Sequence, residues 1–231
     1  MGTGVSKPHD GEPYLSTLQG TRTGWLVRFC ANRWASLGLV VAITLTDHVD
    51  SEQQLSFLPR ALADEPCHLA TAMVVLGAYT RWRGRAPGRL FVWAMLSSSV
   101  LIDLDHLPLQ FGSRILTAGT PRPYTHALWV VVLSAAVAVG AGRRYRGSGS
   151  ARARAVERIA AGAAWGLGAH FLRDVATAPI ALWWPVSRAG VQAPYFWYVV
   201  ALLVLATLPP PPGSRLRGRP SQTAGISRSW P

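Results

Sequence analysis

The chain has few charged residues: Asp, Glu, Lys and Arg make up 15% of its 231 residues. A soluble domain usually carries about 25%, so this composition is poorly suited to a water-exposed surface. The hydrophobic fraction of 49% excludes a chain that is disordered throughout. Two Cys exclude a disulfide scaffold and a Cys-rich zinc module. The length fits one domain with tails.

Several common catalytic motifs are also absent. The sequence has no H-E-x-x-H zinc protease helix, no G-x-S-x-G nucleophile elbow and no Gly-rich phosphate loop before a helix. The sequence also lacks the G-x-S-G motif of a rhomboid-type Ser/His protease. Ser97, Ser98 and Ser99 are therefore better explained as a patch of small residues at which helices pack. Lipid phosphatases of the acid-phosphatase type carry S-R-x5-H-x3-D, but the residue six before His170 is Ala164.

The sequence does contain long apolar runs, at 34–46, 67–80, 90–109, 126–142, 159–185 and 195–209. They are apolar on all sides, unlike the striped helices of soluble proteins. A span needs about 20 residues, so several runs are long enough only if the polar residues at their ends enter the membrane. Lipid offers the backbone no hydrogen-bond partner, so each span should be helical. We predict an all-α, polytopic transmembrane helix bundle of five to six spans; a soluble all-α bundle would have too little polar surface.

Composition divides the chain into four parts. Residues 1–33 show no sustained hydrophobic periodicity and are expected to form a disordered basic tail. Residues 34–66 hold a possible extra span and an acidic outer loop, with Pro66 as a helix breaker. Residues 67–209 form the membrane-embedded domain, and the Pro- and Arg-rich stretch 210–231 is expected to be a second disordered tail.

The net charge of +12 comes from 23 basic and 11 acidic residues. Such basicity is compatible with nucleic-acid binding or with the cytoplasmic loops of a membrane protein. Between the apolar runs, 18 Lys and Arg fall in the two tails and in the loops 81–89 and 143–158. The positive-inside rule then predicts six spans with both termini cytoplasmic, and no nucleic-acid partner. If 34–46 is re-entrant instead, the N-terminus lies outside. Cys30 and Cys67 fall on opposite sides, so no disulfide between them is expected.

This topology brings His and Asp residues from four spans to the outer face. They are His68, Asp103, Asp105, His106, His126, His170 and Asp174. Ionisable residues inside spans are costly and commonly functional. His170 and Asp174 are four residues apart and share a helix face, so both can bind one metal, or Asp174 can orient the imidazole.

The segment from Asp103 to His106 places two carboxylates and a His within four residues. Burying these groups without a cation is costly; the alternative is an acidic helix end that faces water. Thr125 suits an N-cap before the next helix, and Arg122 near a helix start suits an anion such as phosphate. His68 and His126, taken alone, are equally compatible with interfacial polar residues. Four residues in polar stretches are expected to lie outside any site: His9, Asp47, His48 and Asp50.

These motifs resemble those of the bacterial SOS-inducible, inner-membrane metal-dependent hydrolases, the YdjM-like family, over about 67–187. The family has a His early in its first core helix, here His68, and S-x-x-P-D-x-D-H closing the next, here 99–106. H-R-x-x-T-H-S corresponds to 121–127, and H-x-x-x-D-x-x-T to 170–177. The chain departs from these motifs at three positions: Ile102 replaces the family Pro, Pro121 a His and Ala127 a Ser.

The resemblance implies a divalent metal site with the ligands His68, Asp103, His106, His126, His170 and Asp174. Catalytic roles fall to Asp105 as ligand or general base, to Asp174, and to Arg122 or Arg173 as a headgroup contact. The mixed N/O donor set suits zinc best, with manganese second. A bound ion would activate water and polarise a phosphoryl or acyl oxygen. We expect hydrolysis of an ester or phosphoester of a lipid or other amphiphile, at the outer leaflet of the inner or plasma membrane.

Two other functions stay open at this stage. Intramembrane His and Asp residues can bind a moving ion or proton in a transporter or channel, although the sequence shows no paired inverted repeats with broken helices. The replacement of a family His by Pro121 fits a membrane scaffold protein with a degenerate site.

Overall fold

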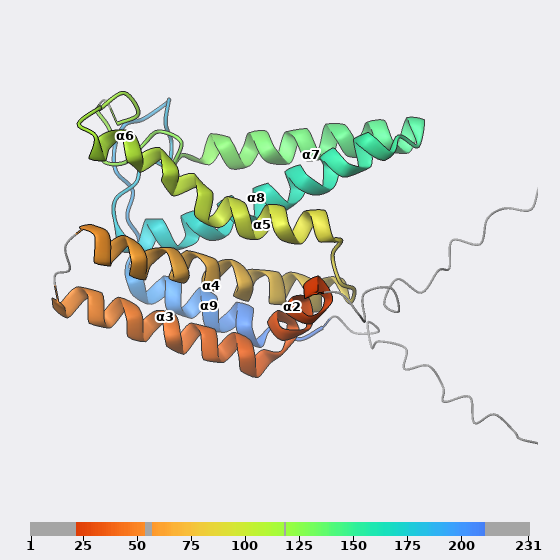
Figure 1. Cartoon of the computed structure of the whole chain (residues 1–231), viewed down its shortest axis with the longest axis horizontal. Helices are drawn as coiled ribbons and strands as arrows, with labels where there is room; N and C mark the ends of the chain where they lie inside the picture. The colour runs from red at the N-terminus through yellow and green to blue at the C-terminus, as the bar shows by residue number, and fades with distance from the viewer. Residues whose placement is uncertain (1–21, 54–56, 118, 211–231) are drawn as a thin grey trace, which may run out of the picture.

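A computed structural model describes residues 22–53, 57–117 and 119–210, and these residues are almost entirely helical (Figure 1). The elements are α2 (Arg22–Ala31), α3 (Arg33–Gln53), α4 (Phe57–Arg83), α5 (Arg89–Leu101), the 3-10 helix η1 (Ile102–His106), α6 (Leu107–Gln110), α7 (Leu128–Ser148), α8 (Ala151–Thr177) and α9 (Tyr195–Thr207). Within the described ranges, β-structure is limited to one isolated bridge between Ile180 and Val191. The predicted all-α class is confirmed.

The helices lie side by side along the long axis of the molecule, with α2 packed across one end of α4 (Figure 1). Helix α8 packs between α5 and α7, while α4 contacts α3, α5, α8 and α9. One buried apolar cluster joins α2, α4 and α5 around Leu76 and Met95. A second joins α3, α4 and α9 around Ile43 and Leu202. The two clusters share α4, which therefore ties the N-terminal helices to the rest of the bundle.

Two stretches of helix are long and apolar enough to cross a membrane by length and composition: 89–109, which comprises α5, η1 and α6, and α7. Helices α2 and α3 meet this criterion only together, and they are bent by 81°. A broken span or a re-entrant loop would have this shape, so both alternatives for 34–46 stay open. Helix α7 packs against α8 and leaves Val132, Leu133 and Val137 exposed, as a lipid-facing helix would.

Two or three spans are therefore supported for the described part of the chain, and the five to six spans stay a prediction. Helices α4 and α8 are long enough, at 27 residues each, but they carry the polar site residues. Helix α9 is apolar but has only 13 residues.

The helices extend beyond the apolar runs that predicted them. Helix α2 occupies 22–31, so the predicted disordered tail 1–33 is wrong for that part; residues 1–21 and the C-terminal tail from 211 onward lie outside the described residues. The acidic stretch predicted as a loop is mostly helical, because α3 continues to Gln53 and α4 begins at Phe57. Pro66 lies inside α4 rather than ending it.

The Arg-rich loop predicted at 143–158 is likewise helical except at one tight turn. Arg is a good helix former, so α7 and α8 both extend into it. Gly149 ends α7 with φ +66°, in the left-handed region that Gly adopts readily. The Ser150 hydroxyl then accepts a hydrogen bond from the backbone N–H of Ala153 and caps α8.

Glycines allow α8 to approach α5 very closely. A Cβ atom at Gly162 would lie 2.3 Å from the carbonyl oxygen of Phe91, and one at Gly166 would lie 2.1 Å from that of Met95. The two glycines are four residues apart and so share one helix face, a small-residue arrangement common between membrane helices. The Ser98 hydroxyl also donates to the Ala163 carbonyl, which confirms the packing role predicted for this serine.

Replacing Gly166 with Ala should force α5 and α8 apart. Overpacking at such a contact costs about 1–3 kcal/mol, so we expect a lower thermal midpoint for Gly166→Ala in detergent. Gly168→Ala is the matched control on the same helix, because no described atom lies within 4 Å of its Cβ position. Equal midpoints for the two variants would show that the close contact does not limit stability.

Candidate metal centre

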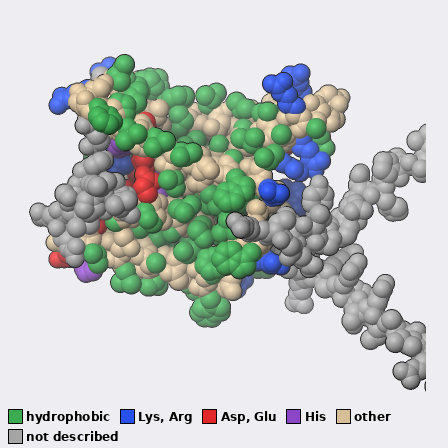
Figure 2. All heavy atoms as spheres, viewed as in Figure 1, with side chains coloured by type: hydrophobic (Ala, Val, Ile, Leu, Met, Phe, Trp, Pro, Cys, Tyr) green, Lys and Arg blue, Asp and Glu red, His purple; other side chains and the backbone are tan. Residues whose placement is uncertain are grey.

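The His and Asp residues of the predicted site lie together at one end of the bundle. Helix α4 supplies His68, the end of α5 and η1 supply Asp103 to His106, the loop before α7 supplies His126, and α8 supplies His170 and Asp174. Figure 2 shows acidic and His side chains toward this end and most of the visible Lys and Arg toward the other.

Four donor atoms form the centre of this cluster, and we call them the central donors: His126 Nε2, His170 Nε2, Asp103 Oδ1 and Asp174 Oδ2. His126 Nε2 lies 3.0 Å from Asp103 Oδ1 and 3.5 Å from Asp174 Oδ2. His170 Nε2 lies 3.7 Å and 3.0 Å from the same two oxygens. Three of the four side chains are fully buried, and that of Asp103 is 16% exposed. Each of the two imidazoles therefore faces both carboxylates.

Helix α5 fixes the orientation of His170. The His170 Nδ1–H group donates to the Ser99 carbonyl oxygen over 2.9 Å, which leaves Nε2 as the atom directed at the carboxylates. Metal-binding His residues are commonly oriented by such a second hydrogen bond. His170 also follows Gly166 by one helical turn, so the close contact between α5 and α8 brings it to Ser99.

His68 stacks on His170, with ring centroids 3.9 Å apart and an angle of 16° between the rings. It is fully buried, and neither ring nitrogen has a hydrogen-bond partner in the described structure. Its Nε2 lies 3.6 Å from Asp174 Oδ1 and 3.9 Å from Asp103 Oδ2. His68 therefore contacts the oxygens of these carboxylates that the central donors do not use.

Asp105 and His106 lie on the more exposed side of the cluster. The Thr125 hydroxyl donates a short hydrogen bond to Asp105 Oδ2, and that oxygen is 3.2 Å from His126 Nδ1. His106 Nε2 lies 3.6 Å from Asp103 Oδ1. Asp105 thus stands on the far side of the His126 ring from the central donors, where a carboxylate orients a metal-binding imidazole. Thr125, predicted to cap a helix, instead holds this carboxylate.

The cluster has an excess of negative charge. Arg122 Nη1 donates to Asp174 Oδ1 at 2.7 Å, but few other cations are near the carboxylates. Burial lowers the pKa of His126, yet the carboxylates of Asp103 and Asp105 outweigh this effect and raise it to about 9. Several buried donor atoms also lack a hydrogen-bond partner, among them His68 Nε2, His106 Nε2, His170 Nε2 and Asp174 Oδ2. Unpartnered buried N and O donors around a negative centre fit a divalent cation.

A second polar network, which the sequence motifs did not predict, adjoins the cluster. Arg173 is 3% exposed, and its guanidinium donates to both carboxylate oxygens of Asp47 at 2.7 and 2.9 Å. It also donates twice to Asp64 Oδ1, at 2.6 and 3.0 Å. The Tyr195 hydroxyl donates to Asp47 as well. Asp47, expected to be a bystander in a polar stretch, therefore forms an ion pair, because α3 packs beside α4 and brings it to Arg173.

This network removes Arg173 from the candidate substrate contacts, because Asp47 and Asp64 already occupy its guanidinium. Of the two predicted headgroup contacts, only Arg122 reaches the cluster. A more general signal was available in the sequence: a buried Arg in an apolar helix needs a carboxylate partner, and the acidic stretch before His68 is the nearest source.

The structure brings together all six predicted ligand residues, and their role as ligands stays a prediction. The ligand atoms form two groups, and within each group they lie within 4.8 Å of one another. The first group is His68, His170 and Asp174, and the second is Asp103, His106 and His126. Exposed His48 lies apart on α3, and His9 lies outside the described residues. Cys30 and Cys67 are both free, as expected.

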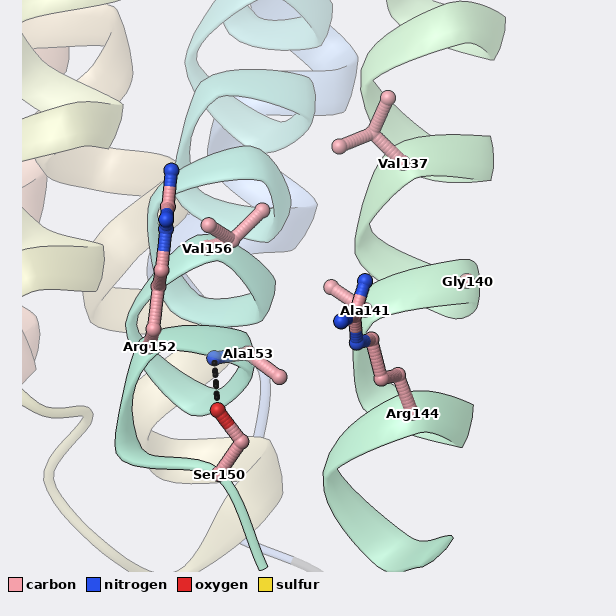
Figure 3. Close-up of a pocket in the computed structure, with 8 residues that line it drawn as sticks. All are labelled: Val137, Gly140, Ala141, Arg144, Ser150, Arg152, Ala153 and Val156. Carbon is pink, nitrogen blue, oxygen red and sulfur yellow. Dashed lines mark hydrogen bonds between the residues drawn. The ribbon is translucent and has the colours of Figure 1, made fainter. Parts of the chain in front are cut away.

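A groove of about 590 Å³ lies between α7 and α8 at the opposite end of these helices (Figure 3). Its lining residues are Val137, Gly140, Ala141, Arg144, Ser150, Arg152, Ala153 and Val156. The lining includes no His and no carboxylate, so the groove is separate from the candidate metal centre.

The chain was compared with protein families, curated proteins and solved structures. Residues 64–227 match the model of a family described as YdjM inner membrane protein. No curated protein and no solved structure matches the chain. The matched segment includes the whole cluster but not α3, which supplies Asp47.

Removing the Asp47 carboxylate should destabilise the fold. Breaking one partner of a buried ion pair costs about 3–5 kcal/mol, and Asp64 still pairs with Arg173, so we expect a loss of about 3 kcal/mol for Asp47→Asn. Denaturation in detergent would measure it, with exposed Glu52→Gln on the same helix as the control. If both variants unfold alike, the Arg173 network does not stabilise the bundle.

Proposed function

The chain belongs to the YdjM inner membrane protein family, and we propose that it is an integral membrane metal-dependent hydrolase. The spacing of the central donors is the observation that carries this proposal. Their contacts of 3.0 to 3.7 Å bracket the roughly 3.3–3.4 Å between neighbouring ligands of a tetrahedral zinc ion with bonds of about 2.0–2.1 Å. The donor set of two imidazoles and two carboxylates suits zinc, with manganese as the second choice.

The proposed chemistry depends on what the cation supplies and on how the surrounding side chains are held. A bound divalent ion lowers the pKa of water and polarises a phosphoryl or acyl oxygen. Ser99 holds His170 by a hydrogen bond, and the Asp105 carboxylate lies 3.2 Å from Nδ1 of His126, where it would orient the ring of a metal-bound imidazole. Arg122 donates a hydrogen bond to Asp174 in this structure. With a cation beside Asp174, this guanidinium would be available for an anionic group of the substrate.

Exposed apolar side chains beside the cluster favour an amphiphilic substrate. Leu104 and Leu107 are 56% and 47% exposed, and Phe111 in the following loop is 86% exposed. They flank the segment that carries Asp103, Asp105 and His106. A polar site bordered by exposed apolar residues, at the end of an apolar helix, suits a lipid or another amphiphile whose headgroup is hydrolysed.

We place the cluster at the outer leaflet, in a multi-pass protein with both termini cytoplasmic. The proposal follows from the distribution of basic residues, most of which lie at the end of the helices away from the cluster (Figure 2). Labelling of single Cys variants from either side of sealed vesicles would test this orientation.

The cation is tested by metal analysis of the detergent-purified protein. We expect wild type to retain zinc and His170→Ala to lose most of it, because this imidazole contributes one of the central donors. His48→Ala is the matched control, since it removes an exposed His of α3 that is none of the proposed ligands, and it should retain as much zinc as wild type. Equally little metal in wild type and His170→Ala, after dialysis against zinc, would refute the proposed metal site.

The proposed role of Arg122 is tested on hydrolysis. We expect Arg122→Met to lower kcat/KM for a fluorogenic phosphoester amphiphile by about 10²-fold, the usual effect of removing one donor to a developing negative charge. Its zinc content should be unchanged. Arg114→Met, at an exposed position of the same loop, serves as the control. If both variants hydrolyse the amphiphile equally fast, Arg122 does not contact the substrate.

A further inference from the structure

We propose that the cluster holds a second divalent cation, in a subsite formed by His68 and Asp64 and completed by the remaining oxygens of Asp103 and Asp174. This second subsite rests on the proposed function, because the first cation takes the central donors. It assigns a role to Asp64, which lies outside the motifs recognised in the sequence.

The surroundings of His68 are those of a metal ligand rather than of a hydrogen-bonded core residue. Its Nε2 has three carboxylate oxygens around it, from Asp64 at 3.5 Å, Asp174 at 3.6 Å and Asp103 at 3.9 Å. It makes a hydrogen bond with none of them, although the ring is fully buried. A buried imidazole that stays unpartnered is costly, and an ion between Nε2 and these oxygens would satisfy it.

The two shared carboxylates each direct their oxygens to different sides. Asp174 Oδ2 faces His126 and His170, whereas its Oδ1 faces His68 and accepts the hydrogen bond from Arg122, which a cation there would displace. The two oxygens of Asp103 are arranged in the same way: Oδ1 faces His126 and His170, and Oδ2 faces His68. Carboxylates arranged like this can bridge two ions, and ions in two-metal sites lie about 3.5–4 Å apart.

Asp64 is held in place by a partner that leaves one of its oxygens available. Its Oδ1 accepts both hydrogen bonds from Arg173, while its Oδ2 faces His68. Asp64 and His68 are four residues apart on α4 and so share a face of that helix. Arg173 is itself fixed by Asp47, so the network beside the cluster positions Asp64 for a cation.

The charge of the cluster also calls for more than one divalent cation. Five carboxylates lie in contact with it or with Arg173, and only two guanidinium groups oppose them, those of Arg122 and Arg173. The carboxylates belong to Asp47, Asp64, Asp103, Asp105 and Asp174. When the imidazoles are neutral, as metal ligands must be, three of these negative charges stay uncompensated, and one divalent cation leaves one of them.

Two cations would remove this excess and let an anionic group approach. Paired divalent ions are the arrangement of phosphatases and nucleases, where they stabilise both the attacking and the leaving oxygen. A paired site therefore suits the phosphoester alternative of the proposed substrate, because two ions can hold both oxygens of an in-line displacement.

The second subsite is tested by manganese loading of the full-length protein in detergent. We expect two Mn²⁺ per chain in wild type by elemental analysis, with an electron paramagnetic resonance spectrum that shows exchange coupling between them. His68→Ala and the near-isosteric Asp64→Asn should each bind one Mn²⁺ and give the spectrum of an isolated ion. Glu52→Gln is the control: it exchanges a carboxylate for an amide at an exposed position of α3, outside the Arg173 network, so two coupled ions should remain.

Each other outcome has a distinct meaning. One Mn²⁺ per wild-type chain, or two without coupling, would overturn the second subsite and leave the first intact. No bound Mn²⁺ or zinc in wild type would overturn the proposed function itself. Two coupled ions in Asp64→Asn would overturn the assignment of Asp64, and this variant decides the matter if His68→Ala does not fold.

Discussion

The close contact between α5 and α8 is the constraint on which the cluster depends. Two rows of residues, each spaced by four, face one another along these helices: Phe91, Met95, Ser99 and Asp103 on one side, and Gly162, Gly166, His170 and Asp174 on the other. The glycines admit the backbone of α5 within reach of α8. At the third position an imidazole replaces the glycine and donates to the Ser99 carbonyl, and at the fourth lie the two carboxylates that face this imidazole. The same helix pairing thus provides both the packing and the site, because i, i+4 residues stay on one face.

Burying so many carboxylates in an apolar bundle requires partners, and the protein supplies them from two directions. Arg122 arrives from the loop before α7, and Arg173 lies on α8 with its partner Asp47 on α3. Helix α3 lies outside the segment that matches the family, yet its carboxylate fixes an arginine next to Asp174. The N-terminal helices are therefore part of the support of the cluster. Helix α4 connects this network to the cluster, since its Asp64 contacts both Arg173 and His68.

The sequence was informative wherever function follows from spacing along one helix. The pairs His170 and Asp174, and Asp103 and His106, were recognised because i, i+4 and i, i+3 neighbours share a face, and apolar runs predicted an all-α chain. Contacts between helices distant in sequence could not be derived in this way. The polar neighbours of Asp47 predict a solvent-exposed residue, and only the packing of α3 beside α4 brings it to Arg173. Helix ends were missed for a related reason: Arg, Asp and Glu are compatible with helix and with loop, and packing decides between them.

The replaced family residues bear on whether the cluster is complete. Pro121 stands where the family has a His, but it packs near the Cα hydrogens of Gly190, where an added Cβ would lie 3.3 Å from the proline ring. Ala127 stands where the family has a Ser, and it occupies the N-cap position of α7; a serine there would cap the helix. Neither replacement takes a donor from the four atoms around which the imidazoles and carboxylates converge. Residue 121 adjoins Arg122 in the loop before α7, so under the proposed function this replacement bears first on the position of Arg122.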